Sequence, residues 1–276
     1  MSRSERHSVK TDIQRMPLIE VTGEESTGIL EQRLQDDLNE IGLIDNELVQ
    51  NSIRLALSLH EGQKRTYELY VNHVLRVTIR LIEQFGITDP DIIAAAVLHD
   101  SLEDKADKLI QHQSPETPIP VDPRIKRAMG HQALQQFASS YGENDVADLV
   151  FELSILPVSS SSTRAAKIQA YLGYTARIME TGDARARIIK HADFIDNTHT
   201  PLELENKHKR AQLDPKQIGA YALHIAGLER EDSLVIGKIR EEIIEILKQL
   251  EAEALERMDA RSGLGEIGGL GSLLSA

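Results

Sequence analysis

The sequence predicts an all-α protein, and three observations lead to this fold class. Apolar residues recur at helical spacing along most of the chain, as in the segment 27–43. No stretch combines alternating apolar and polar residues with the turn signals of hairpins. Capping residues mark the helix ends: Gly86 closes one helix, and Asp89 and Pro90 begin the next as cap and first-turn proline. A helical bundle accounts for all three observations.

The apolar stripes justify the helices in chain order. Leu30, Leu34 and Leu38 form the stripe of the first helix, and 47–60 follows it. In the next helix, 67–84, the stripe consists of Tyr70, Val74, Val77 and Leu81. The helix that begins at Pro90 has no polar stripe, so we expect it to be mostly buried. The remaining predicted helices span 124–140, 144–155, 163–180, 184–198, 214–228 and 231–259.

We expect a single helical domain over residues 26–260. Residues 1–25 are polar and mixed in composition, so this segment is predicted to be loosely ordered. Between Asp104 and Tyr141 we expect an irregular insertion, 105–140, that could cap a site. Its irregularity is inferred from Pro115, Pro118, Pro120 and Pro123.

The tail 261–276 is rich in Gly, Leu and Ser and is predicted to be flexible. It contains Gly263-Leu-Gly265-Glu-Ile-Gly268, which matches a dinucleotide-binding pattern but lacks the preceding strand that this pattern requires. The predicted helix before it, 231–259, has an apolar stripe that would pack on the domain or pair two copies into a homo-oligomer.

Composition narrows the class of function. The net charge of −13 argues against general nucleic-acid binding, because affinity for a phosphate backbone needs a basic surface. The longest apolar run, Ile92 to Leu98, is too short to cross a bilayer, and no secretory signal follows the N-terminus. The absence of cysteine excludes disulfides, zinc–thiolate sites and a cysteine nucleophile. These features fit a cytoplasmic protein that does not associate with membranes.

The most informative motif is a cluster of ionisable residues directly after the apolar run. His99, Asp100, Glu103 and Asp104 are spaced so that a helix would gather them on one side. Buried charges need a partner of opposite sign or a metal ion, and no Lys or Arg lies between Asp91 and Asp104. The motif therefore favours a metal site, whereas a solvated acidic helix end is the alternative.

Two further residues lie on apolar helix faces and could complete such a site. His73 shares a side with Tyr70 and Val77, and Asp193 shares a face with Ala186 and Ile189. Taken alone, His73 would be a hydrogen-bonded core histidine, and Asp193 a helix-end or ion-paired carboxylate. Their presence together with His99 and Asp100 favours a shared role.

These four residues resemble the H…HD…D signature of the HD metal-dependent phosphohydrolases, and specifically the RelA/SpoT-type hydrolases of guanosine tetraphosphate. The resemblance covers residues 45–202 in the family's order. It rests on His60-Glu-Gly-Gln-Lys-Arg65, Ala94-Ala-Ala-Val-Leu-His-Asp-Ser-Leu-Glu-Asp104, Tyr141-Gly142 with Val146-Ala147 and Leu149-Val150, and Ile188-Ile-Lys190-His-Ala-Asp193-Phe-Ile-Asp-Asn197.

The resemblance implies an HD-domain helical bundle that hydrolyses guanosine 3′,5′-bis(diphosphate), or its triphosphate form, to GDP or GTP and pyrophosphate. One divalent ion would be bound by His73, His99, Asp100 and Asp193. The mixed nitrogen and oxygen ligands suit manganese, iron or zinc, and the family implies manganese. Glu103 and Asp104 would transfer protons. The candidate contacts to the guanine nucleotide are Lys64, Arg65, Tyr70, Lys190, Asn197 and Thr200, although the basic residues could be surface charges and Asn197 and Thr200 helix-end caps.

The chain also departs from the family's pattern. Val74 replaces a proline, Phe194 replaces an arginine, Ile155 replaces a lysine, and the loop 65–70 is one residue short. These changes leave open an HD phosphohydrolase for another nucleotide, such as a deoxynucleoside mono- or triphosphate. A third hypothesis is a catalytically weak nucleotide-sensing protein. Because the chain after Thr200 is shorter than a synthetase domain, we expect a hydrolase that acts alone.

Overall fold

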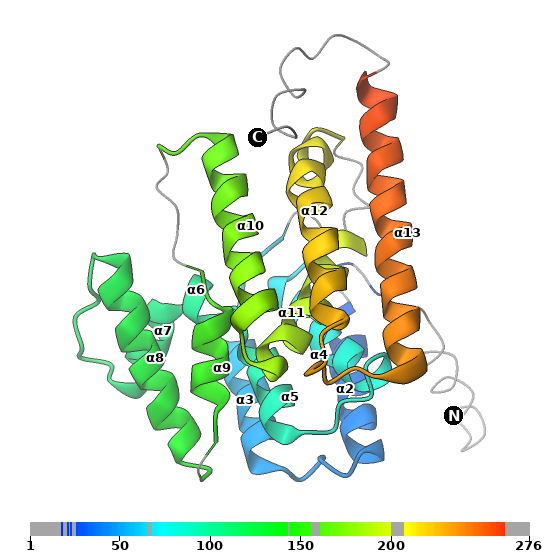
Figure 1. Cartoon of the computed structure of the whole chain (residues 1–276). Coiled ribbons are helices and arrows are strands. Elements are labelled where there is room, and N and C mark those ends of the chain that lie inside the picture. Colours follow the sequence, from blue (N-terminus) through cyan, green and yellow to red (C-terminus); the bar gives the residue numbers. More distant parts are fainter. Residues whose placement is uncertain are drawn as a thin grey trace.

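The computed structural model describes residues 26–65, 68–142, 144–155, 161–199 and 207–262, together with Leu18, Val21 and Gly23. No β-strand occurs among these residues, so the predicted all-α class is confirmed (Figure 1). The helices are α2 (Ser26–Glu40), α3 (Glu47–Leu59), α4 (Tyr70–Glu83), α5 (Pro90–Leu98), α6 (Ser101–Asp104), α7 (Ala106–Gln113), α8 (Pro123–Ser139), α9 (Val146–Leu153), α10 (Arg164–Thr181), α11 (Ala184–His199), α12 (Lys207–Leu228) and α13 (Gly237–Ser262).

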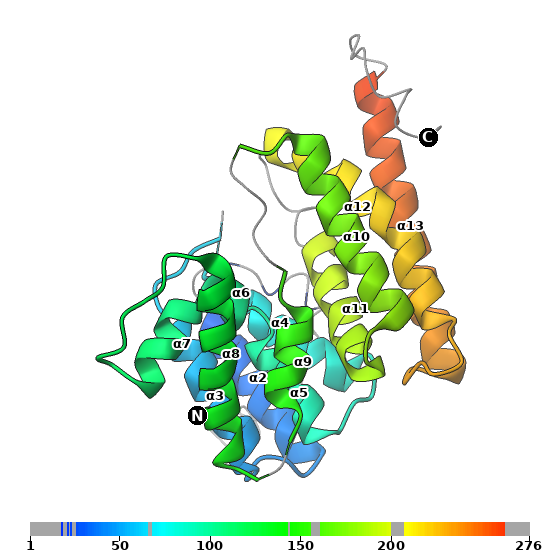
Figure 2. The ribbon, with the colours of Figure 1, turned by 60° about the vertical axis from the view of Figure 1, so that its left-hand side comes forward.

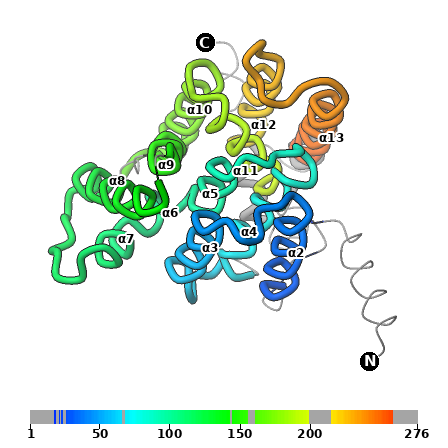
Figure 3. The backbone as a smooth tube through the Cα atoms, turned by 90° about the horizontal axis from the view of Figure 1, so that it is seen from below, coloured from blue at the N-terminus to red at the C-terminus, as the bar shows by residue number. Residues whose placement is uncertain are grey.

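The short helix α5 lies at the centre of the bundle. It packs against α3, α4, α9 and α11, and these helices surround it in Figure 3. Asp89 caps its first turn by accepting from the backbone N–H groups of Asp91 and Ile92. Every residue from Ile92 to Leu98 is buried, as its lack of a polar stripe predicts. Burial continues beyond the helix at His99, Ser101 and Leu102.

The N-terminal helix α2 packs against α4. Most of the segment 1–25, predicted to be loosely ordered, lies outside the described residues, but Leu18 and Val21 are buried in the core. The backbone oxygen of Gly23 also accepts a hydrogen bond of 2.8 Å from the side-chain amide of Asn72. The end of the segment is thus held to α4 by apolar burial and by a backbone contact.

The predicted irregular insertion, 105–140, is largely helical. It forms α7 and α8, which pack against each other, and α8 also packs on α6 and α9 (Figure 2). The four prolines are confined to residues 115–123. Pro123 itself begins α8, with Asp122 as its cap. The predicted helix 124–140 corresponds to α8, and the irregular stretch is confined to 114–122. The predicted irregularity was wrong at 106–113, where α7 forms.

The helices α10, α11, α12 and α13 form the other part of the bundle, to the right in Figure 2. The helix α12 packs against α10, α11 and α13. It begins at Lys207, earlier than the predicted 214, and contains Pro215. The helix α13 extends to Ser262, and the rest of the tail predicted to be flexible lies outside the described residues. Among the described residues, no helix has both the length and the apolarity of a membrane span.

The contact between α2 and α4 generates a prediction about stability. Asp37 is buried, and burial together with the charge of Glu83 raises its pKa from 3.8 to about 7. The folded carboxyl group thus binds its proton more tightly than the unfolded one. The protonated carboxyl group of Asp37 therefore makes its full contribution to stability below about pH 4, and this contribution is lost as the pH rises to about 7.

The variant Asp37→Asn cannot ionise. Between about pH 4 and 7, ionisation of Asp37 should lower the free energy of unfolding of the unmodified chain. We expect the free energy of unfolding of Asp37→Asn to fall by about 1–3 kcal/mol less over the same range. Urea unfolding across this pH range measures the difference. The exposed residue Asp107 supplies a control, Asp107→Asn, with no such effect. Identical pH dependence in Asp37→Asn and the unmodified chain would contradict the prediction.

Candidate metal and hydrolase site

The candidate site begins where α5 ends. His99 and Asp100 form a turn between α5 and α6, and they are not part of one continuous helix as predicted. The helix stops because His99 N–H bonds to Ala96 O, three residues back, while its imidazole Nδ1 donates to the same oxygen at 2.7 Å. The tighter turn still carries both side chains toward α4 and α11.

His73 from α4 and Asp193 from α11 meet these two residues. His73 Nε2 lies 3.3 Å from Asp193 Oδ1 and 3.6 Å from Asp100 Oδ2. His99 Nε2 lies 3.0 Å from Asp100 Oδ2 and 3.8 Å from Asp193 Oδ1. His73, His99 and Asp193 are buried, and each offers one ligand atom within 4.8 Å of the others, so this group could hold a metal ion. Asp100 lies beside the group.

The hydrogen bonds of the two imidazoles test whether this group fits a metal ion. His73 Nδ1 bonds to Asp196 Oδ2 at 2.9 Å, and His99 Nδ1 bonds to a backbone oxygen. Each Nδ1 therefore carries the proton of the neutral ring, and each Nε2 presents a lone pair. His99 Nε2 is buried with no hydrogen-bond partner. Lone pairs of nitrogen and carboxylate oxygen that face one another need a cation between them, so the residues fit a divalent ion.

The pKa values of the same groups show that the site attracts positive charge. Burial and the charge of Arg65 act to lower the pKa of His73, but hydrogen bonds with Asp100, Asp193 and Asp196 outweigh them and raise it to about 9. Burial acts to raise the pKa of Asp193, but Lys190 and the two imidazoles outweigh burial and hold this pKa below its ordinary value. In the metal-free protein a proton supplies the compensating charge.

A buried ion network behind His73 was missed by the sequence analysis. Asp196 is fully buried and accepts from Arg76 at 3.0 Å and from Arg80 at 3.2 Å, in addition to its bond with His73. Arg76 also donates to both oxygens of Glu68, at 2.6 and 2.7 Å. A carboxylate on the outer nitrogen of a metal-binding imidazole fixes its ring and tautomer. Helical spacing could have revealed the two arginines, because Arg76 and Arg80 follow His73 on one helix face, but not their partner Asp196 on α11.

Glu103 and Asp104 lie on the single turn of α6, directly after the turn that carries His99. Desolvation and the nearby charge of Asp100 raise the pKa of Glu103 to about 7, although the residue as a whole is exposed. Its Oε2 accepts from Ile155 N–H at 3.4 Å. Asp104 is exposed, and its Oδ2 accepts from the side-chain amide of Gln63 at 2.9 Å.

Four of the six candidate substrate residues are placed around the ligands. Tyr70 donates to Asp100 Oδ2 at 2.6 Å, and Lys190 donates to Asp193 Oδ2 at 2.6 Å. Arg65 donates to Asn197 Oδ1 at 2.6 Å, and Asn197 in turn donates to Asp193. The second terminal nitrogen of Arg65, Nη1, is buried without a hydrogen-bond partner.

The other two candidates are not brought to the ligands in the same way. Lys64 is exposed on the loop, where its backbone pairs with that of Leu69. Thr200 lies outside the described residues. A lysine that the sequence analysis missed, Lys216 of α12, lies 3.8 Å from the ring centroid of Tyr171. Burial and the charge of Lys190 lower the pKa of Lys216, so the two lysines act on each other near Asp193.

Phe194 stands where the family has an arginine, and its side chain points toward α12. Its ring stacks on His224 with centroids 4.0 Å apart and meets Tyr221 edge-on at 5.0 Å. Both partners belong to α12. The side chain is buried, so it adds to the packing of α12 on α11 and offers no charge to a substrate.

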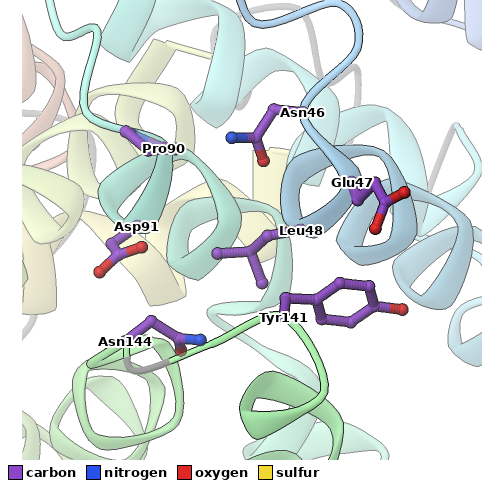
Figure 4. A pocket seen from close by; sticks show the side chains of 7 residues that line it. All are labelled: Asn46, Glu47, Leu48, Pro90, Asp91, Tyr141 and Asn144. Carbon is purple, nitrogen blue, oxygen red and sulfur yellow. The ribbon is translucent and has the colours of Figure 1, made fainter.

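A pocket lies at the opposite end of α5 from the candidate site. Figure 4 shows its lining side chains, which come from the starts of α3 and α5 and from the α8–α9 connection. None of the predicted site residues belongs to this pocket. Its lining consists of Asn46, Glu47, Leu48, Pro90, Asp91, Tyr141 and Asn144.

Comparisons with known proteins bear on the fold. The chain matches no protein-family model and no curated protein sequence. Among solved structures it is similar to a metazoan ortholog of SpoT, which is described as hydrolysing ppGpp and playing a role in starvation responses. The TM-score is 0.50 with 20% sequence identity, and the match covers 74% of this chain and 96% of that one. The likeness bears on the fold alone, and the predicted all-α helical bundle is confirmed.

We expect the purified protein to bind about one manganese, iron or zinc ion per chain, because two imidazoles and two carboxylates converge at the end of α5. His99→Ala and Asp193→Ala each remove a ligand and should lose the metal. Elemental analysis after gel filtration measures the content, and circular dichroism verifies the fold.

The control for this experiment is His131→Ala. His131 pairs with Asp148 at 2.8 Å on the surface of α8 and α9, away from the candidate ligands, so its loss should leave the metal content unchanged. Full metal occupancy in His99→Ala and in Asp193→Ala would exclude the ligand set.

Proposed function

We propose that this chain is a metal-dependent phosphohydrolase of the HD superfamily that hydrolyses guanosine 3′,5′-bis(diphosphate) or its triphosphate form. The products are GDP or GTP and pyrophosphate. The observation that carries the proposal is the buried group of His73, His99 and Asp193, whose ligand atoms face one another at the end of α5. The likeness of the fold to that of a ppGpp hydrolase supports the choice of substrate.

His73, His99, Asp100 and Asp193 would hold the ion, for which manganese is our first choice. When bound, such an ion lowers the pKa of a coordinated water and polarises a phosphoryl oxygen. Other groups of the chain orient the ligand side chains. Asp196 orients His73, the Ala96 carbonyl orients His99, and the Tyr70 hydroxyl group orients Asp100.

Glu103 and Asp104 would move the protons of the reaction. Water attacks the phosphorus bonded to the 3′ oxygen, this P–O bond breaks, and the 3′ oxygen needs a proton to leave as a hydroxyl group. Because its pKa is about 7, Glu103 can carry that proton at neutral pH. Asp104 is then the group that accepts the proton of the water.

Three basic residues favour a substrate with several phosphates. Lys190 and Lys216 act on each other electrostatically near Asp193, and Arg65 has an unpartnered buried nitrogen on the other side of Asn197. Like charges held close together are stabilised by a polyanion between them. A nucleotide that carries diphosphates at both ends of its ribose supplies such charge.

A second candidate is hydrolysis of a different nucleotide, and one observation favours it. Phe194 is buried against α12, so the positive charge that the family carries at this position is missing. A substrate with fewer phosphates, such as a deoxynucleoside monophosphate, would need fewer cations. The metal ligands and the proton-transfer residues would be the same in both cases.

Assays with a panel of nucleotides separate the two candidates. With manganese present, we expect pyrophosphate to be released from guanosine 3′,5′-bis(diphosphate), with the 5′ phosphates retained in GDP. Deoxynucleotides and cyclic nucleotides should remain intact. Anion-exchange chromatography identifies the products. Release of orthophosphate from a deoxynucleoside monophosphate, with the bis(diphosphate) untouched, would favour the second candidate.

The variants Glu103→Gln and Asp104→Asn separate catalysis from metal binding. Because both residues lie on α6 beyond the ligands, their amides should keep a near-normal metal content. Loss of a general acid or base typically costs about 10² to 10⁴ in rate, so turnover should fall by at least about two orders of magnitude. Steady-state kinetics and elemental analysis measure the two effects. Wild-type turnover in either variant would remove that residue from the mechanism.

A further inference from the structure

The loop between α3 and α4 carries two side chains at the candidate site, His60 and Gln63, that no part of the proposed mechanism uses. The loop is closed by backbone bonds of 2.8 Å from Arg65 N–H to Glu68 O and from Tyr70 N–H to Gln63 O. His60, at its start, is buried with only 2% of its surface exposed. A buried polar residue at the edge of a catalytic site needs a physical reason.

Gln63 connects this buried histidine to Asp104. His60 Nδ1 lies 2.8 Å from Gln63 Oε1, and Gln63 Nε2 donates to Asp104 Oδ2 at 2.9 Å. The ring of His60 stacks on Tyr70, with centroids 4.9 Å apart and an interplanar angle of 12°. Tyr70 also donates to the candidate ligand Asp100. The histidine is thereby held on one face by stacking and at one nitrogen by the amide.

The direction of the Gln63 amide follows from these contacts. If the amide were reversed, its oxygen would face a carboxylate oxygen, and two acceptors cannot share a hydrogen bond. In the observed direction the amide oxygen accepts from His60, which therefore carries a proton on Nδ1. The carboxylate of Asp104 and the Nδ1–H of the buried imidazole thus favour the same direction of the amide.

Asp104 needs such support because of its position. It is exposed and is the last residue of α6, a helix of one turn, so little else restricts its side chain. The bond from Gln63 engages Oδ2 and leaves Oδ1 available to accept a proton. Misplacement of a catalytic group by about 1 Å can cost about 10²-fold in rate.

We propose that Gln63 is a positioning residue that orients the carboxylate of Asp104 for proton transfer, with the other end of its amide held by His60. The proposal rests on the proposed function, because it assigns proton transfer to Asp104. It extends that function to two residues that do not touch the ion or the reacting atoms.

The variant Gln63→Met keeps the length of the side chain and removes the hydrogen bond. We expect kcat to fall about tenfold, with KM within about twofold of wild type and the metal content unchanged. In an Asp104→Asn background the same change should have no further effect on kcat, since Gln63 acts only through Asp104. A merely structural role would lower kcat equally in both backgrounds.

The variant Gln63→Glu tests whether kcat recovers at low pH. Near pH 8 the introduced carboxyl group is ionised and repels Asp104, so kcat relative to wild type should be at least as low as in Gln63→Met. Near pH 5.5 the introduced group can carry a proton and donate it to Asp104, so the ratio should recover. The ratio for Gln63→Met should not change with pH.

The matched control is Gln50→Met. Gln50 donates to Gln35 at 2.9 Å between α3 and α2, a side-chain bond of the same type outside the site, and its loss should leave kcat unchanged. Wild-type kcat in Gln63→Met, an equal loss in the control, or loss of metal together with activity would each overturn the proposal.

A measurement without substrate distinguishes failure of this proposal from failure of the proposed function. The side-chain amide resonance of Gln63, identified by its absence in Gln63→Met, should shift in His60→Ala and in Asp104→Ala. An unchanged resonance in both variants overturns the proposal even if the enzyme is active. If the resonance shifts but no bis(diphosphate) is hydrolysed, the hydrogen bonds stand and the assignment of function is wrong. Turnover ratios are then measured on whichever nucleotide is hydrolysed.

Discussion

Two imidazole nitrogens that face carboxylate oxygens at the end of a buried helix are the constraint on which the rest of this structure depends. Like lone pairs repel, and inside a protein such repulsion is weakly screened. His73, His99 and Asp193 are therefore stable together only with a cation among them, whether a proton or a metal ion. The helices α4, α5 and α11 have to deliver these atoms to one place while remaining well packed.

The same constraint explains the charges behind the site. Asp196 supports His73, but its own charge is fully buried and must be compensated. Arg76 and Arg80 provide two positive charges, and Glu68 returns one negative charge. Each added ion compensates the one before it. The network reaches Glu68, in the loop that also carries Gln63 and Arg65, which contact Asp104 and Asn197.

Much of the fold could be predicted from local sequence. Apolar spacing predicted the helices, and Asp89 with Pro90 marked the start of the central helix, because caps and periodicity are properties of neighbouring residues. The break after Leu98 was not predicted. It depends on the His99 side chain, which bonds to the Ala96 carbonyl. The helix α7 was missed because the prolines that follow it were taken to make the whole insertion irregular, whereas a proline affects only the residues close to it.

The residues of the candidate site likewise divide into those that local sequence predicts and those that only the tertiary structure shows. The motif placed His99, Asp100, Glu103 and Asp104 together, since they are close in sequence. The partners of His73 and Arg76 could not be read locally, because Asp196 follows them by 123 and 120 residues, respectively. The buried position of Phe194 likewise depends on α12, a helix that the family resemblance does not cover. Contacts between distant helices require the tertiary structure.

That separation along the chain also sets an order of assembly. During synthesis the ribosome releases α4 and α5 long before α11, so His73, His99 and Asp100 are present while Asp193 and Asp196 are still missing. Closing so long a loop is entropically costly and slow compared with forming the local helices. The full donor set exists only after α11 has docked. An ion held by all four side chains would therefore mark a finished molecule, and partly made chains would compete poorly for the same metal.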